Sequence, residues 1–208
     1  MAATLIHWLL AYKLNPDACG LYYMGNFAPD AIDIREGVTR AEKDKWHLRD
    51  GPDREAALKE LYLRIDRNDP FQKGYLVHLF FDMWWDREII SRFEKETESS
   101  DWFPVYGNEN GVGGAWVYIN MPWMDDIVAR FKASPTDFKT PLPEPTKDEI
   151  IKYNDFMFSP SWIIKYGYTP ARKDNIKKNN NTILTPDFLE FYTDIIAEKY
   201  NDWVKNFF

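Results

Sequence analysis

Apolar residues recur along most of this chain at the spacing of a helix, and no segment shows a convincing one-by-one alternation of the kind a strand has. Residues 53–67 place them at positions 57, 58, 61 and 65, which is typical of one helix face. Residues 2–13 carry them around most of the circumference, which predicts a largely buried helix. The pattern therefore indicates an all-α protein.

Local signals mark where further helices begin. Thr39 with Glu42, and Thr146 with Glu149, fit the capping box, in which a hydroxyl and a carboxylate satisfy free amides at a helix start. Two more helix starts are marked by a capping residue followed by proline, at Asp69-Pro70 and at Thr185-Pro186. These signals predict helices over 40–50, 70–96, 115–134 with a bend near Pro122, 146–158 and 185–208, and a short helix running into a loop over 21–34.

Two segments are predicted to lie outside helices. Residues 97–114 contain GNENGVGG, and these glycines predict a flexible surface loop or lid. The stretch lacks the residues of a phosphate-binding loop and does not complete GxGxxG. Residues 140–146 form a proline-rich connector. Because no internal repeat is present, we expect a compact multi-helix single domain over 1–208, with a helical C-terminal portion over 146–208.

The composition narrows the class of protein. The 208 residues are 45% hydrophobic and 17% aromatic, enough for a substantial core. The net charge of -7 argues against a nucleic-acid polymer as partner. No stretch approaches the roughly eighteen apolar residues of a membrane span. Cys19 is the single cysteine, which excludes an intramolecular disulfide, and the apolar start lacks a basic leader, so we expect a cytoplasmic protein.

The segment GYLVHLFFDMWWD, residues 74–86, places His78 and Asp82 four positions apart among apolar side chains. A carboxylate removed from water needs compensation, which an arginine such as Arg87 or Arg92, a hydrogen-bond network or a metal ion could supply. The four-residue spacing puts both side chains on one helix face. An imidazole nitrogen and a carboxylate oxygen so placed could bind one ion at about 2.0–2.2 Å.

The other candidates are His7, His47 and Asp30. The chain has three histidines, and each lies in an expected helix beside apolar neighbours. Taken singly, each histidine also fits a core residue with a hydrogen-bond partner. Asp30 follows Pro29, whose fixed φ stiffens the turn and could aim the carboxylate inward, although a simple loop or capping aspartate is an equal alternative.

These motifs in their order resemble the zinc-dependent phospholipase C family, which is related to the P1-type nucleases. A histidine in the first helix is followed by a G-x-x-x-P-D turn (GNFAPD, 25–30), a histidine in a later helix (KDKWHLRD, 43–50) and G-Y-x-x-H-x-x-x-D (GYLVHLFFD, 74–82). The motifs cover residues 7–86 and use every histidine of the chain. The all-α expectation agrees with the fold of that family.

The resemblance implies a role for each motif residue. Asp30, His47, His78 and Asp82 would hold one metal ion. Asp30 and Asp82 could bridge to a second ion, which His7 would help to bind. The family's later histidine ligands are absent, because no histidine follows position 78. We therefore expect one or two ions, zinc first, with manganese, iron or nickel also suited to these ligands; replacement carboxylates would come from Asp86, Glu88, Asp125 and Asp126.

The implied activity is hydrolysis of a phosphoester, either a phospholipid head group or another small phosphodiester, by water that the metal activates. Asp30 is the expected general base. Trp46 and Trp85 could contact the substrate, and Lys45 and Arg49 could bind its phosphate, although aromatic rings are mainly core material and such cations usually form a solvated helix face. The alternative is a non-catalytic helical protein with a structural metal or a buried His/Asp network, which predicts a closed site without a pocket.

Overall fold

The computed structural model describes residues 2–97, 102–165 and 181–207, and these segments contain helices and no strand. This confirms the all-α class. The helices are α1 (Thr4–Leu14), α2 (Gly20–Phe27), the 3-10 helix η1 (Ala28–Ile34), α3 (Arg40–Trp46), α4 (Arg54–Arg64), α5 (Pro70–Trp84), the π-helix η2 (Trp85–Ile90), α6 (Ser91–Glu96), α7 (Trp102–Asn120), α8 (Met124–Lys132), α9 (Lys147–Phe156), α10 (Pro160–Lys165) and α12 (Pro186–Lys205).

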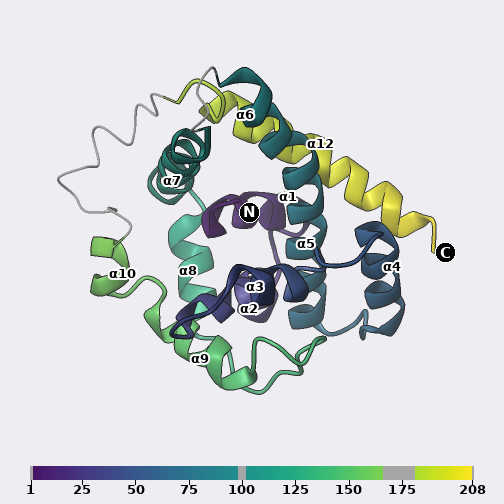
Figure 1. Cartoon of the computed structure of the whole chain (residues 1–208). Coiled ribbons are helices and arrows are strands. Elements are labelled where there is room, and N and C mark those ends of the chain that lie inside the picture. The colour runs from purple at the N-terminus through teal and green to yellow at the C-terminus, as the bar shows by residue number, and fades with distance from the viewer. Residues whose placement is uncertain (1, 98–101, 166–180, 208) are drawn as a thin grey trace.

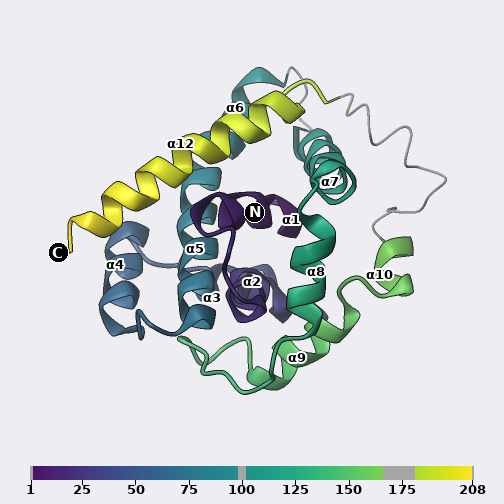
Figure 2. The same cartoon turned by 180° about the vertical axis from the view of Figure 1, so that it is seen from behind.

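Helices α1 and α2 lie at the centre of the molecule, and most of the other helices surround them (Figures 1 and 2). Helix α1 packs against α2, α5, α7 and α12, while α2 packs mainly against α5 and α8. This central position explains why α1 is apolar around most of its circumference, with Leu5 through Ala11 all buried. None of the helices in the described part of the chain combines the length and apolar character that crossing a bilayer requires.

The capping signals of the sequence are realised. Thr39 and Glu42 form a complete capping box at α3, and Thr146 and Glu149 form another at α9. Asp69 accepts hydrogen bonds from the first amides of α5, whose chain then continues through η2 and α6 to Glu96. The predicted helix over 70–96 is therefore present, with a π-helical segment in its middle that the apolar pattern does not reveal.

The helix that contains His47 is shorter than predicted. Helix α3 ends at Trp46, and His47 is its C-cap rather than an interior residue. Leu48 follows in the left-handed region, with φ 57°, a conformation that costs a side chain about 1 kcal/mol and is normally taken by glycine at a helix end. This turn replaces the end of the helix expected over 40–50 and redirects Arg49 toward α5.

The glycine-rich stretch is helical, so the predicted loop over 97–114 is wrong for its described residues. Helix α7 runs from Trp102 to Asn120 and contains all of GNENGVGG. Contacts distant in sequence hold it: the carboxylate of Glu109 accepts backbone hydrogen bonds at 2.8–3.0 Å from Thr182, Ile183 and Leu184. Gly113 lets α7 approach α1 and α12, since a methyl group there would lie 3.1 Å from Leu189. Local glycine content could not predict these contacts.

Two glycines bring α2 and α5 into direct backbone contact. A Cβ on Gly25 would lie 1.9 Å from the carbonyl oxygen of Phe71, and one on Gly74 would lie 1.9 Å from that of Tyr22. Real Cβ atoms do not approach so closely, so a larger residue at either position would push the helices apart. Both glycines open motifs noted in the sequence, and their contact places α2 beside the first turns of α5.

Candidate metal centre

The structure brings the five predicted ligands together in one buried cluster. His7 lies on α1, Asp30 on η1, His47 at the end of α3, and His78 and Asp82 on α5. The three histidines and Asp82 are fully buried, and Asp30 is 6% exposed. Their ligand roles stay predictions.

The separations within this cluster suit a shared ion better than direct hydrogen bonds. An Asp82 oxygen lies 3.4 Å from Nε2 of His7, and the other lies 3.5 Å from Nε2 of His78. The Asp30 oxygen Oδ1 lies 3.5 Å from Nε2 of His47. A good N–H···O bond spans about 2.7–3.2 Å. Two ligands held at about 2.0–2.1 Å on a tetrahedral ion lie about 3.3–3.4 Å apart.

The ligand atoms fall into two overlapping groups. Atoms of His7, Asp30 and His78 all lie within 4.8 Å of one another, and so do atoms of His47, His78 and Asp82. His78 belongs to both groups. The arrangement is therefore compatible with one ion or with two, as the sequence indicated.

Backbone carbonyls orient two of the imidazoles. Nδ1 of His78 lies 2.6 Å from the carbonyl oxygen of Asn26, and Nδ1 of His47 lies 2.8 Å from that of Lys43. Because a carbonyl only accepts, Nδ1 carries a proton in each ring, and Nε2 faces the aspartates of the cluster. Such a carbonyl partner is the usual second contact of a metal-binding histidine.

Several atoms of the cluster have no hydrogen-bond partner among the described residues. They are Nδ1 and Nε2 of His7, Nε2 of His47, Nε2 of His78 and Oδ1 of Asp82. Buried polar atoms are normally satisfied, so a concentration of unsatisfied polar atoms in one place calls for a missing partner. The donor set of imidazoles and carboxylates fits a divalent transition metal such as Zn²⁺.

Burial and charge keep His7, Asp30 and Asp82 in the protonation states that a metal requires. Burial, reinforced by the nearby His78, lowers the pKa of His7 to about 4, so His7 is neutral at neutral pH. Burial alone would raise the pKa of Asp82, but Arg49 and the adjacent imidazoles outweigh it and hold that pKa well below its usual range. The pKa of Asp30 is also lowered, because His78 and His47 outweigh its burial.

Arg49 supplies part of the charge that compensates Asp82. Its guanidinium donates to Oδ2 of Asp82 at 3.2 Å and to Asp86 at 2.5 Å, and Arg54 donates to the same Asp86 oxygen at 2.8 Å. Arg87, by contrast, lies near Glu55. An arginine therefore compensates the charge of Asp82, as the sequence allowed, but this arginine lies in the turn after α3 and not on the helix of Asp82. The Arg49 contact leaves Oδ1 of Asp82 without a hydrogen bond from the described residues.

A cavity of about 310 Å³ reaches the cluster at Asp30. Thr4 and Asn110 line it, and the Thr4 hydroxyl donates to Oδ2 of Asp30 at 3.1 Å. Tyr153 and Trp162 contribute aromatic walls. The sequence did not indicate these lining residues. Thr4 alone could have been found from its spacing, because it precedes His7 by one helical turn and so lies on the same face of α1.

The four predicted substrate-binding residues do not line this cavity. Trp85 is fully buried and its indole donates to the Tyr106 hydroxyl at 3.0 Å, so it is a core residue here. The Arg49 guanidinium is engaged by Asp82 and Asp86. Lys45 lies 4.7 Å from the centre of the Trp46 ring, at the surface.

The carboxylates suggested as replacement ligands lie elsewhere. Asp86 is bound by arginines, and Glu88 pairs with Lys199 at 2.9 Å. Asp125 and Asp126 are exposed at the start of α8. None of these four belongs to the ligand groups found among the described residues.

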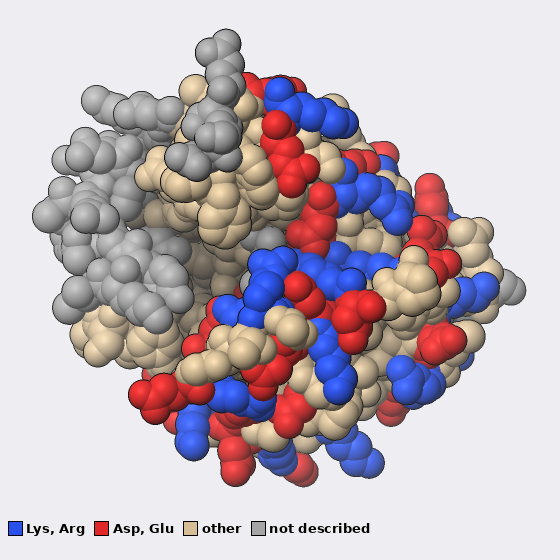
Figure 3. Space-filling view, viewed as in Figure 1, with Lys and Arg blue, Asp and Glu red and all other residues tan. Residues whose placement is uncertain are grey.

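Charges of both signs are interspersed on the face shown in Figure 3, and its coloured residues form no broad basic patch. Comparisons with models of known families, with curated proteins and with solved structures gave no match to this chain. The residues of the site therefore carry the functional information.

Proposed function

We propose that this chain is a metal-dependent hydrolase of phosphoester bonds. The observation that carries the proposal is the set of unsatisfied histidine and aspartate atoms at metal-ligand separations beside a cavity. His7, Asp30, His47, His78 and Asp82 would hold the ion or ions. A divalent ion bound there would lower the pKa of water and polarise a phosphoryl oxygen.

The residues of the cavity define the remaining roles. Asp30 is ionised at neutral pH, so it can orient a water molecule in the cavity and accept its proton. Thr4 fixes the Asp30 carboxylate through its hydroxyl. The described lining contains Asp30 and Asp33 but no lysine or arginine. Because the described lining residues offer a phosphoester no positive charge, a bound metal ion would supply it, and substrate binding should depend on that ion.

The alternative is a structural metal or a purely polar network in a non-catalytic protein. Full burial of the histidines and the Arg49–Asp82 ion pair favour it. The cavity at Asp30 favours the hydrolase, because a structural site is normally closed by four protein ligands. His7 also favours it, since the other four residues would already complete a structural site.

Metal content measured on purified wild-type protein tests the proposal first. We expect about one or two equivalents of a transition metal, and loss of that metal in Asp82→Ala. Asp126→Ala is the matched control, because this exposed carboxylate lies outside the cluster and should leave the metal content unchanged.

Hydrolysis of bis(p-nitrophenyl) phosphate then distinguishes a metal-dependent hydrolase from a non-catalytic protein with a structural metal. The wild type should turn it over with metal present. Asp30→Asn should lower the rate about 100-fold even at saturating metal, because the asparagine amide still offers an oxygen to the ion but cannot accept a proton from water. Bound metal without turnover of this or other phosphodiesters would indicate a structural ion. If the protein bound no metal even after reconstitution, the cluster would be a buried polar network without an ion.

A further inference from the structure

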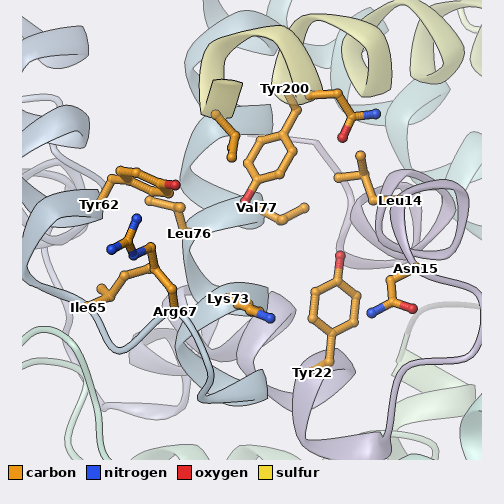
Figure 4. A pocket seen from close by; sticks show the side chains of 12 residues that line it. Leu14, Asn15, Tyr22, Tyr62, Ile65, Arg67, Lys73, Leu76, Val77 and Tyr200 are labelled. Carbon is orange, nitrogen blue, oxygen red and sulfur yellow. The ribbon is translucent and has the colours of Figure 1, made fainter. Parts of the chain in front are cut away.

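A second cavity, of about 300 Å³, lies against α5, and Figure 4 shows the side chains that line it. Successive residues of a helix are about 100° apart, so Lys73, Leu76 and Val77 share one face while His78 and Asp82 occupy the opposite one. Helix α12 and the segment after α4 complete the cavity walls. The cavity is thus separate from the proposed hydrolase site and independent of it.

The floor of this cavity is apolar and buried. Tyr22, Tyr62, Ile65, Leu76 and Val77 line it, and each is 8% exposed or less. The volume lies at the small end of the range for ligand pockets, which is about 300–1,000 Å³. An apolar group placed on such a floor would be largely removed from water and stabilised in proportion to its buried area.

The rim is polar and positively charged. Arg67 and Lys73 lie there, and the described lining contains no aspartate or glutamate, although the whole chain has a net charge of -7. The Lys73 amine forms no hydrogen bond or ion pair with the described residues. Charge complementarity therefore favours an anion at this rim.

Two phenols point into the same space as Lys73. Figure 4 shows the hydroxyl groups of Tyr22 and Tyr200 directed toward the middle of the cavity from opposite walls, with the Lys73 amine below them. Burial raises the pKa of both phenols above the usual value, so both stay protonated at neutral pH. Tyr22 donates to the Ala11 carbonyl at 3.3 Å, whereas the Tyr200 hydroxyl has no such partner among the described residues and is free to donate to a ligand.

We propose that this cavity binds a small amphipathic anion, whose hydrocarbon part lies on the buried floor and whose carboxylate or phosphate meets Lys73 and Tyr200 at the rim. An apolar floor with a few convergent polar groups is the usual composition of a small-molecule site. The Lys73 amine has no hydrogen-bond or ion-pair partner among the described residues that would give it a structural role.

Calorimetric titration of the full-length protein with octanoate and with octyl phosphate tests the proposal. At least one of the two should bind with about one equivalent, and the tighter one identifies the head group. Octan-1-ol should bind at least tenfold more weakly, because it offers no charge to Lys73. Equal binding of the alcohol, or no binding of either anion at millimolar concentration, would overturn the proposal.

Two variants locate the site. Lys73→Met keeps the length of the side chain and should weaken the anion about tenfold, whereas Lys152→Met removes an exposed lysine on α9 and should change nothing. Val204→Trp should fill the half-exposed wall and abolish binding, with thermal unfolding confirming that the variant is folded. Unchanged affinity in both Lys73→Met and Val204→Trp would place the anion elsewhere and refute the assignment.

Discussion

At the scale of single residues, the Asp82 carboxylate is fully buried, and a carboxylate removed from water is costly in free energy unless another group compensates its charge. Its position in an apolar helix indicated from the sequence that some partner neutralises it. The partner found in the structure is Arg49, which reaches Asp82 from a turn distant in the sequence. Local spacing could pair His78 with Asp82, but it could not show Arg49, because only the fold brings that turn to α5.

Replacement of Arg49 by methionine should therefore destabilise the metal-free protein. Breaking a buried ion pair leaves an uncompensated charge, and we expect a loss of about 3 kcal/mol in the free energy of unfolding. Urea denaturation in the presence of EDTA measures it. Addition of Zn²⁺ should recover part of the loss, because a bound cation would replace the guanidinium as counter-charge.

The exposed Arg40 on α3 provides the control for this variant. Its ion pair with Asp44 lies at the surface, so Arg40→Met should change stability by no more than about 0.5 kcal/mol. A loss in Arg49→Met as small as that of the control would mean that the buried pair contributes little. A loss that Zn²⁺ leaves untouched would count against metal binding at Asp82.

At the scale of elements, helix starts were predictable and the helix of GNENGVGG was not. A capping box is complete within four residues, so Thr146 and Glu149 could be recognised from sequence alone. Helix α7 depends on Glu109, whose carboxylate binds backbone amides that follow the undescribed segment over 166–180. The local sequence does not reveal that contact. The prediction of a loop over 97–114 therefore rested on the glycine content alone.

Glu149 also joins two elements, and this link gives a prediction about pH. The Arg35 guanidinium at the end of η1 donates to both Glu149 oxygens, at 2.8 and 3.0 Å. This contact lowers the pKa of Glu149 to about 2 from its ordinary 4.5. The carboxylate thus stabilises the fold above about pH 4.5, and that contribution disappears as the pH falls toward 2.

We expect Glu149→Gln to be less stable than wild type by about 2 kcal/mol near neutral pH, and the difference to shrink as the pH falls from about 5 to 3. Thermal unfolding across this pH range measures it. Asp148→Asn is the control, since this exposed neighbour on α9 should leave the pH profile as in wild type. A difference that stays constant with pH would assign the effect to packing instead of charge.

At the scale of the whole molecule, the candidate metal centre depends on how closely α2 and α5 approach. Gly25 and Gly74 let the two backbones touch, and Asn26 then directs its carbonyl oxygen to Nδ1 of His78 and its amide to the Gly74 carbonyl at 3.4 Å. The sequence showed these glycines as parts of two motifs. That they face each other required the three-dimensional structure.

Gly74→Ala should consequently destabilise the protein severely. The added methyl group would lie 1.9 Å from the Tyr22 carbonyl oxygen, and relieving that overlap requires α2 and α5 to separate. We expect a loss of about 3 kcal/mol in the free energy of unfolding, measured by urea denaturation followed by circular dichroism. The metal content of the folded fraction should fall as well, because the same shift moves the carbonyl that orients His78.

Gly107 on α7 supplies the matched substitution. A Cβ there would meet no atom within 4 Å, so Gly107→Ala should stabilise the protein by about 0.5–1 kcal/mol through the higher helix propensity of alanine. Its metal content should equal that of wild type. If Gly74→Ala behaved like Gly107→Ala, the helices would have room to spare, and close approach could not be what orients the imidazole. Loss of metal in a Gly74→Ala protein of near-normal stability would instead show that the contact serves the site more than the fold.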